Sequence, residues 1–178
     1  MNTPGTLAHH VDFRRLATQQ REIDGELYLS QLPRMIAEMA AGADASGAVR
    51  VHLRFSEDGQ RRVNVAGSIE TTLTLTCQRC LEAFDKHMSV AVAGVVVGDD
   101  DAAANVPRAD EPILAEGDTL DLHTMVSDEL LLALPPVARC GRPDCVSNYE
   151  HVAGTPEPAI DDKHNNPFAV LGQLKRGD

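Results

Sequence analysis

Apolar side chains alternate with polar ones over three successive segments between residues 49 and 96. Successive side chains of a β-strand point to opposite faces, so this period predicts an antiparallel sheet with one buried face. The apolar residues have odd numbers in the first two segments and even numbers in the third, and a turn across Cys77–Phe84 would produce that change. Another turn is expected at Glu57–Gln60, which contains Gly59. The alternating apolar residues are Val49, Val51, Leu53, Phe55, Val63, Val65, Ile69, Leu73, Leu75, Phe84, Met88, Val90, Val92 and Val96.

Two further segments have apolar residues at helical spacing. One is Leu29–Ala43, and the other begins after Asp121, a suitable N-cap, and ends before Pro135. Between them, Gly98–Pro112 is acidic and alanine-rich, which predicts a solvated loop, and a short strand is expected at Ile113–Ala115. We therefore expect an α+β fold with a mainly antiparallel sheet that can curl into a partly closed barrel, two principal helices and a short C-terminal helix.

The composition divides the chain into three parts. Residues 1–146 are expected to form a single α+β domain, and residues 147–165 a flexible acidic and polar linker. Residues 166–178 form a tail with a proline suited to a first helical turn and with regularly spaced apolar residues. That tail either folds back on the domain or docks on a partner through Phe168, Leu171 and Leu174.

Charge and aromatic content restrict the binding modes open to the chain. The formal net charge is −11 and aromatic residues make up 3%, without tryptophan. Phosphates would therefore be repelled at long range, and a broad stacking surface for single-stranded nucleic acid is not expected. The N-terminal residues have no apolar run typical of a signal peptide, and no segment approaches the roughly 20 apolar residues that span a bilayer. We expect a cytoplasmic protein that does not bind membranes.

Four cysteines occur as two pairs, Cys77 with Cys80 and Cys140 with Cys145. Thiolates at these spacings can turn inward from tight loops and bind one tetrahedral zinc ion, at sulfur–zinc distances of about 2.3 Å. A zinc ion with four protein ligands would be structural, because catalytic zinc needs an open coordination position. Three alternatives remain: free buried thiols, a redox pair at Cys77 and Cys80, and a cysteine nucleophile paired with a histidine.

Three ordered motifs give the chain a resemblance to a known family. They are residues 73–84, which contain C-Q-R-C; residues 121–136, which contain Asp128-Glu129 followed by an apolar run; and the C-terminal NPFAVLGQLKR. In order and spacing they resemble the YceD proteins, the large ribosomal RNA subunit accumulation proteins. The matching residues are Cys77, Arg79, Cys80, Glu129, Pro135, Cys145, Phe168, Leu171 and Leu174. Cys140 is matched less closely, since some relatives have another residue there, so family membership does not guarantee a metal.

The resemblance implies a non-enzymatic factor needed for the synthesis, processing or stability of 23S rRNA. It implies pre-ribosomal partners of the large subunit, either 23S rRNA or ribosomal proteins, and no small-molecule substrate. The acidic run Asp99–Asp101 favours a partner with a basic surface, such as a ribosomal protein.

A basic surface is expected on the outer face of the first predicted hairpin. These side chains share the parity opposite to the apolar set, or lie in the C-Q-R-C motif, and could contact RNA phosphates or a partner: Arg50, His52, Arg54, Arg62 and Arg79. An ordinary solvated sheet face explains the same pattern.

Two other functions stay open. A thiol- or metal-dependent enzyme, redox or RNA-processing, is the main alternative, although no clustered histidines and carboxylates and no phosphate-binding glycine loop are present. The third is a chaperone-like module that acts through its tail.

Overall fold

The strands of the computed structural model form a six-stranded mixed sheet and a two-stranded sheet. The structure describes residues 5–108, 110–143 and 145. In the larger sheet the strands are β1 (Gly5–Thr6), β3 (Glu22–Tyr28), β4 (Ala48–Glu57), β5 (Val63–Thr76), β6 (Ala83–Val97) and β7 (Pro112–Leu114), in that order. In the smaller sheet β2 (His10–Asp12) pairs with β8 (Thr119–Asp121).

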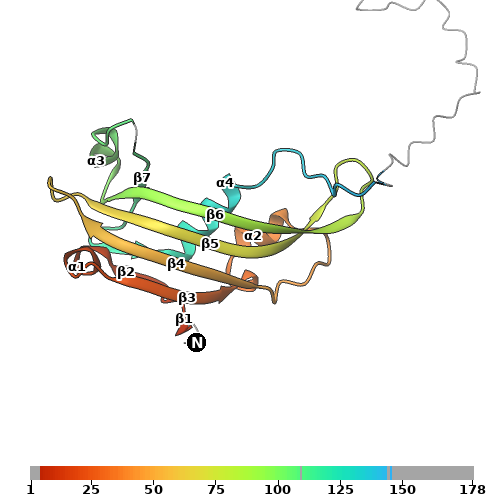
Figure 1. Ribbon diagram of the computed structural model, residues 1–178, viewed down its shortest axis with the longest axis horizontal. Coiled ribbons are helices and arrows are strands. Elements are labelled where there is room, and N and C mark those ends of the chain that lie inside the picture. The colour runs from red at the N-terminus through yellow and green to blue at the C-terminus, as the bar shows by residue number, and fades with distance from the viewer. Residues whose placement is uncertain (1–4, 109, 144, 146–178) are drawn as a thin grey trace, which may run out of the picture. The chain divides into compact units, whose positions relative to one another are not determined.

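The three long strands β4, β5 and β6 form the predicted antiparallel meander (Figure 1). The short strands β1 and β7 are parallel to their neighbours, so the sheet is mixed at both edges. The predicted α+β class is confirmed. The expected closure towards a barrel is not found in the part of the chain that the structure describes, because β1 and β7 end the sheet without pairing with each other.

The register explains the change of parity in the sequence. Phe55 pairs with Val65, so odd numbers face odd numbers across β4 and β5. Ile69 pairs with Val90, so odd numbers face even numbers across β5 and β6. All of these side chains are buried or nearly so, from 0% exposed at Ile69 and Phe55 to 9% at Val90. The predicted apolar face is therefore confirmed.

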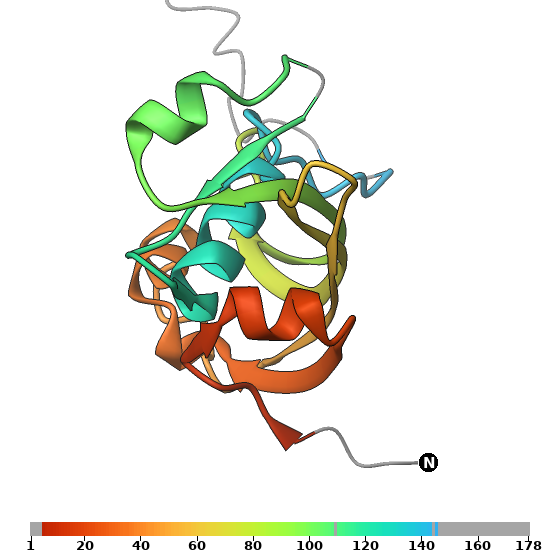
Figure 2. The same cartoon turned by 90° about the vertical axis from the view of Figure 1, so that its left-hand side faces the viewer.

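Helices cover the buried face of the sheet. These are α1 (Phe13–Thr18), α2 (Pro33–Glu38) and α4 (Leu122–Leu132), and Figure 2 shows the curved sheet on one side with α1 and α4 on the other. Phe13 of α1 and Leu122, Val126 and Leu130 of α4 are at most 1% exposed. The smaller sheet β2–β8 leads into α4, whose N-cap Asp121 accepts a hydrogen bond from the Thr124 N–H at 3.0 Å.

The first predicted helix is shorter than the apolar spacing suggested. Leu29–Gln31 form a 3₁₀ turn, and α2 ends at Glu38 because Met39 is extended, with ψ at 160°. The next residue, Ala40, donates its N–H to the carbonyl oxygen of Thr74 at 2.9 Å. A hydrogen bond to β5 thus replaces the helical bond that would continue α2.

The acidic segment after β6 is not wholly a loop, as it was predicted to be. It contains the short helix α3 (Asp100–Ala104), which begins at the N-cap Asp99. The Asp99 carboxylate accepts the Ala102 N–H at 2.7 Å, and Asp100 and Asp101 lie in the first turn, where the helix dipole favours acids. The predicted strand at Ile113–Ala115 is present as β7, one residue earlier.

Two predicted regions lie outside the described residues. They are the linker, residues 147–165, and the tail, residues 166–178, with the docking residues Phe168, Leu171 and Leu174. Docking by the tail stays a prediction. Among the described residues, no helix is both long and apolar enough to cross a bilayer.

The close approach of β4 and β5 at Gly67 gives a test of this packing. A Cβ atom on Gly67 would lie 1.9 Å from the carbonyl oxygen of His52, so Gly67→Ala should lower the free energy of unfolding by at least about 2 kcal/mol. At Gly59 a Cβ would meet nothing within 4 Å, and Gly59→Ala should change it by less than about 1 kcal/mol. Urea denaturation followed by circular dichroism measures both, and equal stability of the two variants would contradict the described register.

Candidate functional site: a four-cysteine cluster

The four cysteines come together at one end of the β5–β6 hairpin, although 60 or more residues separate the two pairs. The Cys77 and Cys145 sulfurs are 3.7 Å apart, and those of Cys80 and Cys140 are 4.0 Å apart. All four sulfurs lie within 4.8 Å of one another. Cys77, Cys80 and Cys145 are buried, and Cys140 is half-buried.

Local hydrogen bonds shape the turn that carries the first pair. Cys77 follows the last residue of β5, and its N–H and carbonyl bind the Glu82 carbonyl and the Leu81 N–H, each at 2.9 Å. Leu81 has a φ of 61°, the left-handed conformation that reverses the chain into β6. The Gln78 N–H donates to the Ala138 carbonyl at 2.8 Å, which holds the segment after α4 beside this turn.

Hydrogen bonds to sulfur shift the acidity of the cluster. The backbone N–H groups of Cys80, Arg79 and Cys140 point at the Cys77 sulfur and lower its pKa to about 5, against the opposing effect of burial. Hydrogen bonding to the Cys140 sulfur, together with burial, raises the pKa of Cys145 to about 12. One sulfur of the cluster is therefore prepared as a thiolate while its neighbour keeps its proton.

Arg142 supplies a positive charge at the edge of the cluster. Its guanidinium lies 3.4 Å from both the Cys140 and the Cys80 sulfurs and 2.5 Å from a Glu82 carboxylate oxygen. These three hydrogen bonds raise the pKa of Arg142, and the backbone N–H of Arg142 lowers the pKa of Cys140. The guanidinium thus favours negative charge on the sulfurs.

The cluster fits a tetrahedral metal ion. Sulfurs bound at about 2.3 Å to one tetrahedral ion lie about 3.8 Å apart. This is close to the 3.7 Å between the Cys77 and Cys145 sulfurs and the 4.0 Å between the Cys80 and Cys140 sulfurs. The cysteines are free thiols, as the metal interpretation requires. Four close cysteines can hold a metal, and no histidine belongs to the cluster among the described residues. The alternative of a cysteine nucleophile paired with a histidine therefore has no geometric support among these residues.

The predicted basic face of β4 is exposed, but its charges are paired with carboxylates of β3. Arg50 contacts Glu26 at 3.0 Å and His52 contacts Asp24 at 2.7 Å. Arg54 contacts Glu22 at 2.5 Å. All three pairs are directly opposite across the β3–β4 ladder, so the antiparallel register creates them. This face presents alternating charges of both signs and not a basic stripe.

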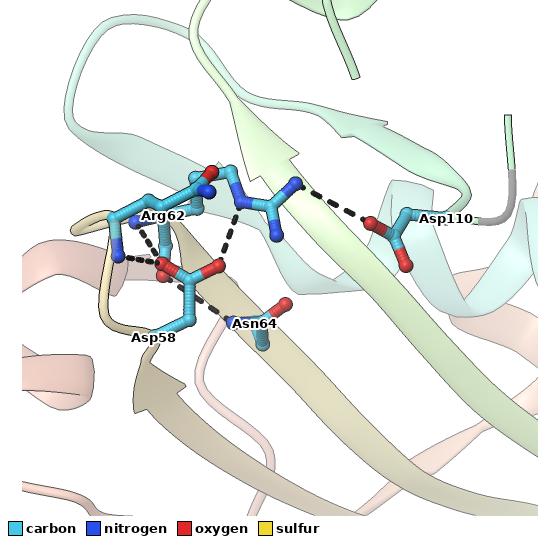
Figure 3. A network of polar contacts seen from close by, with 5 residues as sticks. Asp58, Arg62, Asn64 and Asp110 are labelled. Atoms are coloured by element: carbon cyan, nitrogen blue, oxygen red, sulfur yellow. Dashed lines mark hydrogen bonds and ion pairs between the residues drawn. The ribbon is translucent and has the colours of Figure 1, made fainter. Parts of the chain in front are cut away.

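Arg62, also predicted to bind RNA or a partner, is held within the β4–β5 turn. Figure 3 shows its guanidinium between Asp58, at 2.6 Å, and Asp110, at 3.4 Å. The Asp58 carboxylate also accepts hydrogen bonds from the backbone N–H groups of Arg62 and Gln60, and these bonds lower its pKa. In the same turn, the residue in the left-handed conformation is Arg61 and not Gly59. Arg62 therefore joins the hairpin turn to the segment before β7.

Arg79 differs from the other predicted binding residues. It is exposed in the cysteine turn, and none of the ion pairs found among the described residues includes it. The backbone N–H of Arg79 donates a hydrogen bond to the Cys77 sulfur. Its side chain is in none of those ion pairs.

Histidines and a carboxylate cluster beside α4, so the expectation from the sequence that no histidines and carboxylates cluster was wrong. The Nδ1 atoms of His9 and His10 are 3.0 Å apart, and His9 Nδ1 lies 3.5 Å from the Asp121 carboxylate. His123 packs against His9 with ring centroids 4.2 Å apart, and burial lowers the pKa of His123. The only sequence signal is the adjacent pair His9-His10, since the β2–β8 pairing that brings Asp121 close is non-local.

Comparisons with known proteins agree with the motifs. A family model described as "Large ribosomal RNA subunit accumulation protein YceD" matches residues 65–175. The curated protein of that name from Haemophilus influenzae is 35% identical over 162 residues, which cover 88% of this chain and 90% of the relative. No solved structure matches the chain. The matched span includes both cysteine pairs and α4. The chain therefore belongs to the YceD family.

Proposed function

We propose that this chain is a non-enzymatic binding factor that supports the accumulation of 23S rRNA during assembly of the large ribosomal subunit. The observation that carries the proposal is the family match, whose model spans most of β5, all of β6 and β7, the cysteine cluster and α4. The printed name of the family and of the relative refers to accumulation of the large ribosomal RNA subunit. Accumulation here covers the synthesis, processing or stability of the RNA.

The cysteine cluster supports a structural role more than a catalytic one. The Cys77 thiol, whose pKa is lowered to about 5, belongs to a side chain that is 0% exposed, whereas redox thiols need access to their partner. A metal bound by Cys77, Cys80, Cys140 and Cys145 would have no open position for a substrate. This is why we place the thiol- or metal-dependent enzyme second.

We further propose that the cluster binds a structural zinc ion. Zinc accepts four thiolates in tetrahedral geometry, and the lowered pKa values of Cys77 and Cys140 favour two of the ionised ligands that it needs. Binding of the ion would displace the proton that the raised pKa of Cys145 keeps on that thiol in the metal-free protein. The ion would join the end of the β5–β6 hairpin to the segment after α4.

The paired charges of the β3–β4 face support a protein partner more than RNA at that surface. An RNA phosphate would have to displace Glu22 or Glu26 from an arginine, and their carboxylates would then repel it. We propose that Arg50, His52 and Arg54 contact a protein with mixed charges, and that Arg79 is the residue of the predicted set best placed for a phosphate.

Removal of one ligand tests the zinc proposal. Purified full-length protein should contain about one zinc ion per chain, and Cys77→Ser should lose it and lower the free energy of unfolding by at least about 2 kcal/mol. Gln78→Ala, an exposed neighbour in the same turn, should keep the metal and the stability. Elemental mass spectrometry and urea denaturation give both quantities. A metal-free wild type of unchanged stability after zinc addition would contradict the proposal.

Titration of the metal-free protein tests the arrangement of the thiols. The folded pKa of Cys77 is about 5 against 9.0 for a free thiol, so its ionisation stabilises the fold fully above pH 9.0. That contribution decreases as the pH falls and is absent below about 5. Thiolate ultraviolet absorbance at neutral pH should therefore exceed that of Cys77→Ser. Equal absorbance of the two proteins would show that the backbone N–H groups do not ionise Cys77.

A charge exchange tests the β3–β4 face in cells. In cells lacking the native gene, the ratio of 23S to 16S rRNA should fall and be restored by this chain. The double variant Arg50→Ala with Arg54→Ala should restore the rRNA ratio less well if the arginines contact a partner. The exchange Arg50→Glu with Glu26→Arg retains the ion pair across the strands, so a defect of this variant would reflect a lost partner contact and not a folding defect. A partner contact predicts that the exchanged pair also fails.

Full restoration by every variant would show that this face is an ordinary solvated surface. An unchanged rRNA ratio in cells lacking the gene would contradict the proposed function itself.

A further inference from the structure

A groove of about 740 Å³ runs between β7, the segment leading to β8, and α4. Its floor is apolar, with Ile113 at 9% and Met125 at 4% exposure. Leu114 and Leu132 also line it and are 56% and 73% exposed. Because α4 is anchored by Leu122, Val126 and Leu130 in the core, the groove is a preformed feature of the fold. The two leucines continue the apolar floor to the surface, where a partner can contact them.

The charges around this groove are strongly negative. Five carboxylates line it, whereas Arg34 is its only lysine or arginine among the residues that the structure describes, and Arg34 already forms an ion pair with Asp128. Within the same described part of the chain, His10 is the remaining basic group. The carboxylates belong to Glu111, Glu116, Asp121, Asp128 and Glu129.

Glu129 of α4 is a half-buried carboxylate in this groove. Burial raises its pKa, and the nearby charges of Glu111 and Asp128 raise it further. A cation that entered the groove would relieve the repulsion among these carboxylates. The groove therefore favours a positively charged ligand beside its apolar floor.

We propose that this groove docks a basic amphipathic segment of a protein partner, with apolar side chains on Leu114 and Leu132 and lysines or arginines against the carboxylate rim. This proposal rests on the proposed function for one point only, namely that the partner is a protein of the large subunit. The docking chemistry itself rests only on the groove.

Charge complementarity selects this occupant. RNA would bring phosphates towards five carboxylates, in a protein whose net charge is −11, and would be repelled. An uncharged apolar peptide would fill the floor and leave the rim without counterions. Helix-in-groove recognition combines an apolar stripe with flanking charges, and both halves of that pattern are present here.

The test uses full-length protein and a labelled peptide with leucines at positions i, i+3, i+4 and i+7 and lysines elsewhere. A scrambled peptide of the same composition is the ligand control. Leu114→Ser with Leu132→Ser, and separately Glu111→Gln with Glu129→Gln, should each weaken binding about tenfold or more in fluorescence anisotropy at physiological salt. The scrambled peptide should bind the wild-type protein about as weakly as the groove variants bind the designed peptide.

Two matched variants control for general effects of exposure and charge. Leu81→Ser removes a leucine that is 72% exposed in the cysteine turn, outside the groove. Asp100→Asn with Asp101→Asn removes two acids from α3, which do not line it. Both should bind the peptide within about threefold of wild type.

Equal peptide binding by the groove variants and the wild type would overturn the inference. So would binding that is lost with the α3 variant, or a 23S rRNA fragment that competes for the groove. Stronger peptide binding by Phe168→Ser with Leu171→Ser would assign the groove to the chain's own tail and overturn the partner assignment.

Large-subunit proteins freed of RNA then separate this inference from the proposed function. If the protein captures large-subunit proteins and this capture requires Leu114 and Leu132, the result supports both the groove inference and the proposed function. Peptide binding without capture of these proteins would keep the docking chemistry and overturn the assigned source of the partner, whatever the cellular rRNA ratio shows about the function.

Discussion

The long antiparallel pairing of β5 with β6 is the constraint on which the rest of the protein depends. It runs from Val63 opposite Val96 to Thr76 opposite Ala83, so a single register directs the apolar side chains of both strands to the helices. The same register ends at the turn that carries Cys77 and Cys80. A slip of one residue would expose the apolar face and also turn the first cysteine pair away from the second.

The two ends and two faces of this sheet have different roles. At one end the cysteines join β5–β6 to the segment after α4, and at the other the Asp58–Arg62–Asp110 contacts join β4–β5 to the approach to β7. The helices cover one face, and paired charges occupy the other. A protein held together at both ends in this way presents fixed surfaces, which suits a binding factor better than an enzyme that must open and close.

Much of the fold follows from local sequence pattern. The alternation of Val49–Phe55, the parity change after Cys77 and the cap at Asp121 each act over a few residues, so sequence alone predicts them. The early end of α2 depends on a hydrogen bond from Ala40 to Thr74, which no local pattern reveals. The ion pairs of Arg50 and Arg54 depend on β3, whose short, half-polar strand was not anticipated. Parity alone therefore placed these arginines on the correct face but could not show that acids neutralise them.

Affinity purification of tagged full-length protein from cells, with and without ribonuclease, tests the central claim that this chain is a binding factor for large-subunit assembly. The account predicts that large-subunit proteins and 23S rRNA are enriched over their small-subunit counterparts, and that the proteins stay bound after ribonuclease because protein contacts hold the complex. Recovery without enrichment of any large-subunit component would contradict it.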